Sequence, residues 1–173
     1  FSSNSSGNYN IYSINADGSN LVQLTTDTND EFDPSMSPDG TKIAFSRFNG
    51  TDYDIFIMST DGTVVNISNN PGFEDAFPTW SHDGSKILYQ INTGTYYDLI
   101  IMNPDGSEKV ILTNTSSVED TDAVWSPDNN EIIFASGIAA AYNIYKMNSD
   151  GSDITQLTTV TSNRYPCFEY RPK

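Results

Sequence analysis

The residues of this sequence that could do chemistry are mainly carboxylates, and they recur as adjacent pairs. The pairs follow one another at nearly equal spacing, as Asp30-Glu31, Glu74-Asp75 and Glu119-Asp120. Around the first pair, oxygen-bearing side chains stand at alternate positions: Asp27, Asn29, Glu31 and Asp33. This alternation resembles a calcium loop, although the central glycine and the final bidentate glutamate of an EF-hand are missing. The pattern predicts either a calcium site or a surface for a cationic partner, with solvated loop acids as the alternative.

Other residue types give little basis for catalysis. His82 is the single histidine and takes the place in a turn that Pro38 and Pro127 take elsewhere, while Cys167 is the single cysteine. Nucleophilic catalysis needs a nucleophile beside a base, and we expect no histidine near Cys167. The sequence also has no phosphate-binding glycine loop and no Cys/His cluster for zinc. We therefore predict that the chain is not an enzyme.

The charge balance narrows the partners. The 173 residues carry 23 acids and 8 bases, for a net charge of -15. Such a surface repels nucleic acids and anionic membranes, and no apolar run is long enough to cross a bilayer. Asn, Ser, Thr, Asp and Gly are abundant and Lys is scarce. Together with a start at Phe1 without methionine, this favours a processed protein that is extracellular, on the cell surface or periplasmic.

An internal repeat sets the elements that must position the acids. One block recurs about every 44 residues, starting at Tyr9, Tyr53, Tyr97 and Tyr142, and a second block recurs between them, starting at Asp33, Phe77 and Asp122. In both blocks apolar and polar residues alternate around an Asp-Gly or Asp-Asn pair, which is typical of a tight hairpin. Each repeat therefore predicts four short antiparallel strands, the pattern of a propeller blade.

These blocks resemble a known family. Ser37-Pro38-Asp39-Gly40 with Phe45, followed by Tyr53-Asp54-Ile55 with Met58 and Asp61-Gly62, is similar to the WD-like β-propeller repeat of the TolB type. The resemblance covers nearly the whole chain and implies the fold. It implies less about function, because propellers of this type resemble periplasmic interaction proteins, non-catalytic domains of peptidases and many secreted proteins of unknown role.

We predict an all-β fold, a single β-propeller domain over residues 1–173 with four blades of four antiparallel strands. The repeats lie near residues 9–52, 53–96, 97–141 and 142–173, and residues 1–8 complete the ring. The chain begins inside the second strand of a blade and ends on a first strand, so Phe168 and Tyr170 are expected to pair beside Phe1 and close the ring. The alternatives are donation of that strand to another copy and a fragment of a larger propeller.

The predicted ring places the acid pairs around the mouth of the central channel, with Arg164-Tyr165 in the fourth position. We expect the repeated tyrosines to pack between blades, and Trp80 and Trp125 to lie in the core near the channel. The favoured function is a non-enzymatic extracytoplasmic scaffold that binds protein, including other copies of itself in an oligomer or filament. The alternatives are a calcium- or carbohydrate-binding module and the non-catalytic propeller domain of a larger enzyme.

Overall fold

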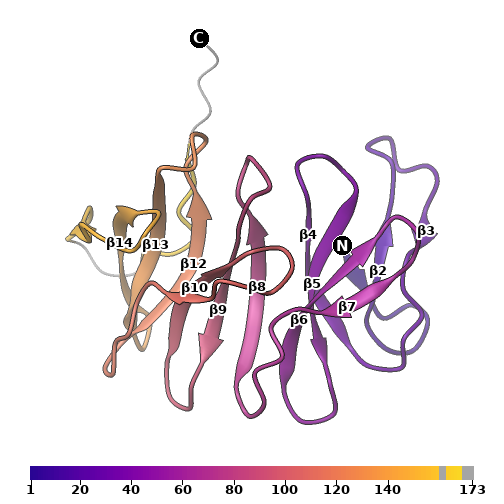
Figure 1. The fold of residues 1–173 in the computed structure, drawn as a ribbon, viewed down its shortest axis with the longest axis horizontal. Helices are drawn as coiled ribbons and strands as arrows, with labels where there is room; N and C mark the ends of the chain where they lie inside the picture. The colour runs from indigo at the N-terminus through magenta and orange to yellow at the C-terminus, as the bar shows by residue number, and fades with distance from the viewer. Residues whose placement is uncertain (160–162, 169–173) are drawn as a thin grey trace.

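The structure is a computed structural model that describes residues 1–159 and 163–168, and every regular element in these ranges is a β-strand. Four antiparallel sheets follow one another along the chain (Figure 1). Blade 1 contains β1 (Ser2–Ser3), β2 (Asn10–Ser13) and β3 (Val22–Gln23). Blade 2 contains β4 (Glu31–Met36), β5 (Lys42–Phe48), β6 (Tyr53–Ser59) and β7 (Val64–Asn66).

Blades 3 and 4 repeat the pattern of blade 2. Blade 3 contains β8 (Glu74–Trp80), β9 (Ile87–Asn92), β10 (Tyr97–Met102) and β11 (Val110–Ile111). Blade 4 contains β12 (Glu119–Trp125), β13 (Glu131–Ile138), β14 (Ala141–Asn148) and β15 (Thr155–Gln156). The all-β prediction is confirmed, and three of the four sheets have the four predicted strands.

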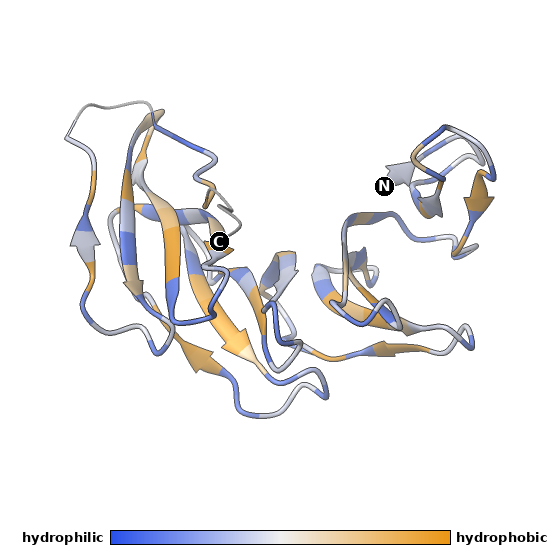
Figure 2. Cartoon of the chain, turned by 90° about the horizontal axis from the view of Figure 1, so that it is seen from above, coloured by the Kyte–Doolittle hydropathy of each residue, from blue (hydrophilic) through white to orange (hydrophobic). Residues whose placement is uncertain are grey.

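The blades lie along an open arc, where we had predicted a closed ring (Figure 2). No described strand of blade 1 contacts a described strand of blade 4. β1 pairs only with β2, so its other edge has no partner in the described chain. The segment after blade 4 contacts that blade, where the Asn163 amide donates to the Tyr142 carbonyl at 3.0 Å. Phe168 is half-buried and lies in no strand, whereas Tyr170 is outside the described residues. Ring closure is therefore not made by the part of the chain described.

The tight turns gather at one end of the blades, which we call the turn face. In an antiparallel sheet the first and third connections lie on the same side, and the Thr60 amide of one turn donates to the Thr41 carbonyl of the other at 3.2 Å. Their glycines adopt positive φ, as in Gly40 with φ 71°. Each turn aspartate accepts a hydrogen bond two residues on, as Asp39 does from the Thr41 amide at 3.0 Å. The opposite end, which we call the loop face, carries the remaining connections.

The core lies between the blades, because alternate side chains of each strand face opposite neighbours. The cluster between blades 2 and 3 includes Ile55 and Trp80, and that between blades 3 and 4 includes Leu99 and Trp125. The indole of Trp80 also donates to the Ser35 carbonyl of the preceding blade at 3.1 Å. These contacts explain why the two tryptophans lie in the core, as predicted.

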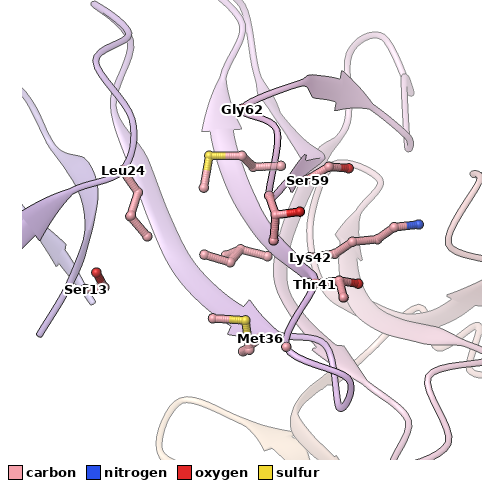
Figure 3. Close-up of a pocket in the computed structure, with 11 residues that line it drawn as sticks. Ser13, Leu24, Met36, Thr41, Lys42, Ser59 and Gly62 are labelled. Carbon is pink, nitrogen blue, oxygen red and sulfur yellow. The ribbon is translucent and has the colours of Figure 1, made fainter. Parts of the chain in front are cut away.

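The seam between blades 1 and 2 is packed less completely. Met36 takes the place in the repeat of Trp80 and Trp125, yet it is 55% exposed whereas they are 7% and 5% exposed. The first strand of the preceding blade, β4 or β8, covers each tryptophan. Blade 1 has no described strand in this first, inner position to cover Met36. A cavity of about 340 Å³ opens at this seam, with Leu24 on one side and Met36 on the other (Figure 3). The seam is thus the least covered part of the core.

Candidate functional site

Strand geometry separates the members of each acid pair. Successive residues of a β-strand point to opposite faces, so adjacent acids cannot both face one ligand. The second members, Glu31, Asp75 and Asp120, are only 0%, 0% and 1% exposed. The first members, Asp30, Glu74 and Glu119, are half-buried or exposed at the loop face. The three predicted pairs therefore divide into a buried set and a surface set.

The buried acids belong to a hydrogen-bond arrangement that recurs in the blades. A Ser or Thr after each fourth strand accepts the amide of the third strand, as Ser68 does from Ile55 at 2.8 Å. The same hydroxyl donates to Asp54 at 3.2 Å, and Thr113 donates to Asp98 at the same distance. Asn70 donates to Asp75 at 2.8 Å. The Ser and Thr hydroxyls thus satisfy backbone amides of the third strands, which is a structural role.

A guanidinium occupies the centre of the predicted calcium loop. Arg47 donates to the Glu31 carboxylate through Nε at 2.8 Å and Nη2 at 2.5 Å, and its Nη1 lies 3.4 Å from Asp27. Asn29 donates its amide to Asp27, and Asp33 lies apart, next to the Ser46 hydroxyl. No group of three or more His, Cys, Asp or Glu residues is placed to hold a metal in residues 1–159 and 163–168. The calcium site on the nine named residues stays a prediction.

Asp75 is the buried acid with the largest electrostatic perturbation. Burial raises its pKa to about 7, against a hydrogen bond from Asn70 that lowers it. Its Oδ1 atom and the Tyr89 hydroxyl are both buried without a hydrogen-bond partner in the described chain. Burial also raises the pKa of Asp120. These carboxyl groups therefore favour the neutral form more than solvated aspartates do.

The surface acids contact the repeated tyrosines. The Tyr97 hydroxyl donates to Glu74 at 2.9 Å, and Tyr142 donates in the same way to Glu119. In the first blade the Tyr9 amide donates to Asp30 at 2.8 Å, while its ring lies 4.7 Å from that of Phe32 in the next blade. The tyrosines thus pack between blades and also orient carboxylates at the loop face.

A pocket opens between blades 2 and 3 at the loop face, and we call it the loop-face pocket. Its volume is about 290 Å³, and its lining comprises Phe32, Asp33, Ser46 and Tyr53 from blade 2 and Glu74, Ala76, Phe77 and Tyr97 from blade 3. Four of these side chains are aromatic and two are carboxylates. Burial raises the pKa of Asp33, against the Ser46 hydroxyl, which lowers it. The pocket is therefore aromatic and acidic.

Phe77 is one of the pocket residues that sequence reasoning missed. It sits at a bulge in β8, between Ala76 and Thr79, with φ 55°. Asp33 and Asp122 occupy the same place in β4 and β12, each with φ 53°. Aspartate tolerates this left-handed conformation better than phenylalanine does. The signal that could have found Phe77 is its departure from aspartate in the aligned repeats.

The fourth position of the predicted acid ring holds a cation. Arg164 Nε donates to Asp122 Oδ2 at 2.9 Å, and its guanidinium carbon lies 4.5 Å from the centre of the Tyr142 ring.

His82 is exposed in its turn, where its amide donates to Asn129 at 2.7 Å, and Cys167 is exposed. The described residues include no helix long and apolar enough to span a membrane.

Comparison with known proteins identifies the family of this arc. The pattern that defines the TolB beta propeller domain matches residues 1–170. The TolB homolog of Chlorobium chlorochromatii is 46% identical over 50 residues, which are 29% of this chain and 11% of the relative. That of Chlorobaculum tepidum is 44% identical over 48 residues, which are 28% of this chain and 11% of the relative.

Solved structures share the fold at lower identity. A protein assigned as TolB from Agrobacterium tumefaciens superposes with a TM-score of 0.79 at 20% identity, covering 95% of this chain and 63% of that one. TolB from Acinetobacter baumannii gives 0.76 at 23% identity, with coverages of 89% and 38%. The chain thus spans less than two thirds of the length of these relatives. The TolB-type resemblance is confirmed, and the chain belongs to the TolB beta propeller domain family.

Proposed function

We propose that the protein is a non-enzymatic, extracytoplasmic scaffold that binds a partner protein at the loop face, around Phe77. Membership of the TolB family supports binding as the role, and the family resemblance favours the periplasm over the cell surface or the medium. A rigid sheet framework that presents variable connections suits recognition. Enzymes also occur on this fold, as the oligogalacturonate lyase of Vibrio parahaemolyticus shows at 17% identity and a TM-score of 0.66. The proposal therefore rests on the site more than on the fold.

The exposure of Phe77 carries the proposal. The side chain is 51% exposed although it is large and apolar, and its backbone is in a conformation that favours aspartate or asparagine. Water contact and local geometry thus both disfavour phenylalanine here. Exposed aromatic side chains beside a pocket are typical of binding hot spots. A protein partner that covers Phe77 would offset the cost of its exposure.

We expect a photo-crosslinking amino acid at position 77 to capture a discrete protein. p-Benzoylphenylalanine replaces Phe77 with another aromatic ring, and the purified chain is irradiated in a cell-envelope extract of the source organism. The matched control carries the same group at Ile154, which is also 51% exposed but lies in blade 4. A crosslinked band from position 77 alone, absent without light, supports the proposal. Equal capture from both positions, or no capture from position 77, contradicts it.

The second candidate role is assembly by strand addition, which the free edge of β1 favours. We propose that the single domain over residues 1–173, with its four repeats, is completed by an added inner strand. Phe1 and Met36 are 52% and 55% exposed beside the place of that strand. The strand comes either from a second copy or from further chain of a larger propeller, as the partial coverage of the relatives suggests.

If a second copy supplies the strand, the protein self-assembles. We then expect the mean particle mass in sedimentation equilibrium to rise with protein concentration. Met36→Glu should hold the chain at monomer mass, because a buried carboxylate at the seam would oppose docking. Val65→Glu is the matched control, since Val65 is similarly exposed on the outer strand of blade 2. A monomer at all concentrations, or assembly that Met36→Glu leaves unchanged, contradicts donation of the strand by a second copy.

A further inference from the structure

The protein contains its own example of how the loop face holds a cation. In blade 4, Arg164 lies over the ring of Tyr142 with its guanidinium carbon 4.5 Å from the ring centre. Its Nε atom donates to the Asp122 carboxylate at 2.9 Å. An aromatic face and a carboxylate together are the elements that hold a guanidinium, through a cation–π contact and a charge-assisted hydrogen bond.

The repeat places the same two elements in blade 2. Asp33 and Tyr53 stand two repeats before Asp122 and Tyr142, and both aspartates lie at the same bulge with φ 53°. The position of Arg164, however, is taken by Ala76 at this boundary, since Tyr165 and Phe77 both follow at the bulge, with φ 57° and 55°. Blade 2 therefore repeats the binding elements of blade 4, but the chain offers only a methyl group, that of Ala76, where blade 4 receives a cation.

The pocket exists at this boundary because its two inner side chains are small. Ser46 and Ala76 line the loop-face pocket between blades 2 and 3. Their counterparts between blades 3 and 4 are Gln90 and Thr121, which are buried and fill the space with a hydrogen bond of 2.9 Å. Polar side chains thus fill the space between blades 3 and 4, whereas the equivalent space between blades 2 and 3 is open.

The pocket also has an excess of negative charge. Burial, followed by the charges of Asp30, Glu74 and Asp33, raises the pKa of Tyr53. None of these three acids takes part in an ion pair within the described ranges. Three acids near one ring attract a cationic group, and Tyr53 and Tyr97 offer aromatic surface for it.

We propose that the loop-face pocket binds the guanidinium group of an arginine side chain from the partner protein. It would lie over Tyr53 and bond to Asp33 and Glu74, as Arg164 lies over Tyr142 and bonds to Asp122. The planar guanidinium stacks on aromatic rings and donates to two carboxylates at once, which an ammonium does less well. This inference rests on the proposed protein-binding function, and it names the group that the partner inserts.

The test uses the full chain and a small arginine probe. N-acetyl-arginine methylamide is titrated while amide resonances are followed by ¹⁵N-¹H correlation spectroscopy. We expect saturable shifts at Tyr53, Ala76 and Phe77. The citrulline analogue has the same shape without the charge, and we expect it to bind at least tenfold more weakly. Citrulline binding as strong as arginine binding would overturn the assignment.

Two variants locate the site. Ser46→Gln with Ala76→Thr transfers the filling pair of the next boundary into the pocket, so arginine affinity should fall at least tenfold while the other resonances stay in place. Glu74→Gln should weaken binding severalfold. Glu108→Gln removes an exposed carboxylate at the turn face and should leave binding unchanged. Unchanged affinity in the filled variant would overturn the proposal. Continued crosslinking at position 77 in that case would leave the protein-binding function standing, so the two failures are distinguishable.

Discussion

Replacing Arg47 with methionine should lower the free energy of unfolding by about 3–5 kcal/mol. This is the usual cost of leaving one member of a buried ion pair without its partner. The Glu31 carboxylate is fully buried, and its Oε1 atom accepts both Nε and Nη2 of Arg47. The guanidinium also lies over the Phe56 ring at 4.7 Å, so its loss removes a cation–π contact as well. Urea unfolding at neutral pH, followed by tryptophan fluorescence, measures the change.

The double variant Arg47→Met with Glu31→Gln should recover a large part of this loss, since it removes both charges. The loss that remains reports the contacts with Phe56 and Asp27. Lys86→Met is the surface control, because its partner Glu108 is exposed and exposed pairs contribute about 0–1 kcal/mol. Equal effects of Arg47→Met and Lys86→Met would contradict the importance of burial, as would a double variant less stable than Arg47→Met.

Replacing Asp75 with asparagine should stabilise the protein above neutral pH and have little effect near pH 4. The folded-state pKa of about 7 lies above the usual 3.8, so the folded protein binds the proton more tightly than the unfolded chain. The associated stability is fully present below the unfolded pKa and is lost as pH rises through about 7. One pKa unit corresponds to about 1.4 kcal/mol, so the gain at high pH is up to about 4 kcal/mol.

Urea unfolding from about pH 2 to about pH 8 measures this difference directly and also covers the pH range in which the control below titrates. Asp39→Asn is a control of opposite sign, since hydrogen bonds from Ser37 and Thr41 lower the pKa of Asp39 to about 2. Its contribution is present above the unfolded pKa and is lost as pH falls. An Asp75→Asn variant that is destabilised equally at every pH would show that Asp75 acts only through its hydrogen bonds.

The strands and turns could be predicted because their signals are local and recur. Alternation along a segment such as residues 42–48 and an Asp-Gly pair at its end are enough to define a hairpin, and several copies average out errors. The same alternation could have shown that Glu74 and Asp75 point apart, although adjacency in sequence suggested a shared site. The acids of each pair therefore divide into a buried and a surface set, and the calcium site on the nine residues stays a prediction.

The remaining features depend on contacts between distant residues. Glu31 meets Arg47 because the β4–β5 register pairs them, and sequence spacing alone does not give this register. The loop-face pocket depends on small residues in two blades, Ser46 and Ala76, which face each other only after packing. The ring closure expected from strand counting is not made by the described residues, since none of the described strands of blades 1 and 4 are in contact. Long-range geometry decided each of these points.

The aspartates of the turn face determine how the charge of the protein changes with pH. Hydrogen bonds donated by Ser, Thr or Asn side chains and by backbone amides lower the pKa of its seven turn aspartates: Asp17, Asp39, Asp61, Asp83, Asp105, Asp128 and Asp150. Burial raises the pKa of Asp33, Asp75 and Asp120, nearer the other end of the blades. On mild acidification the second group loses charge first while the first group keeps it. The turns then keep their negative charge while the buried carboxyl groups lose theirs, and a positively charged surface would attract the molecule by its turns.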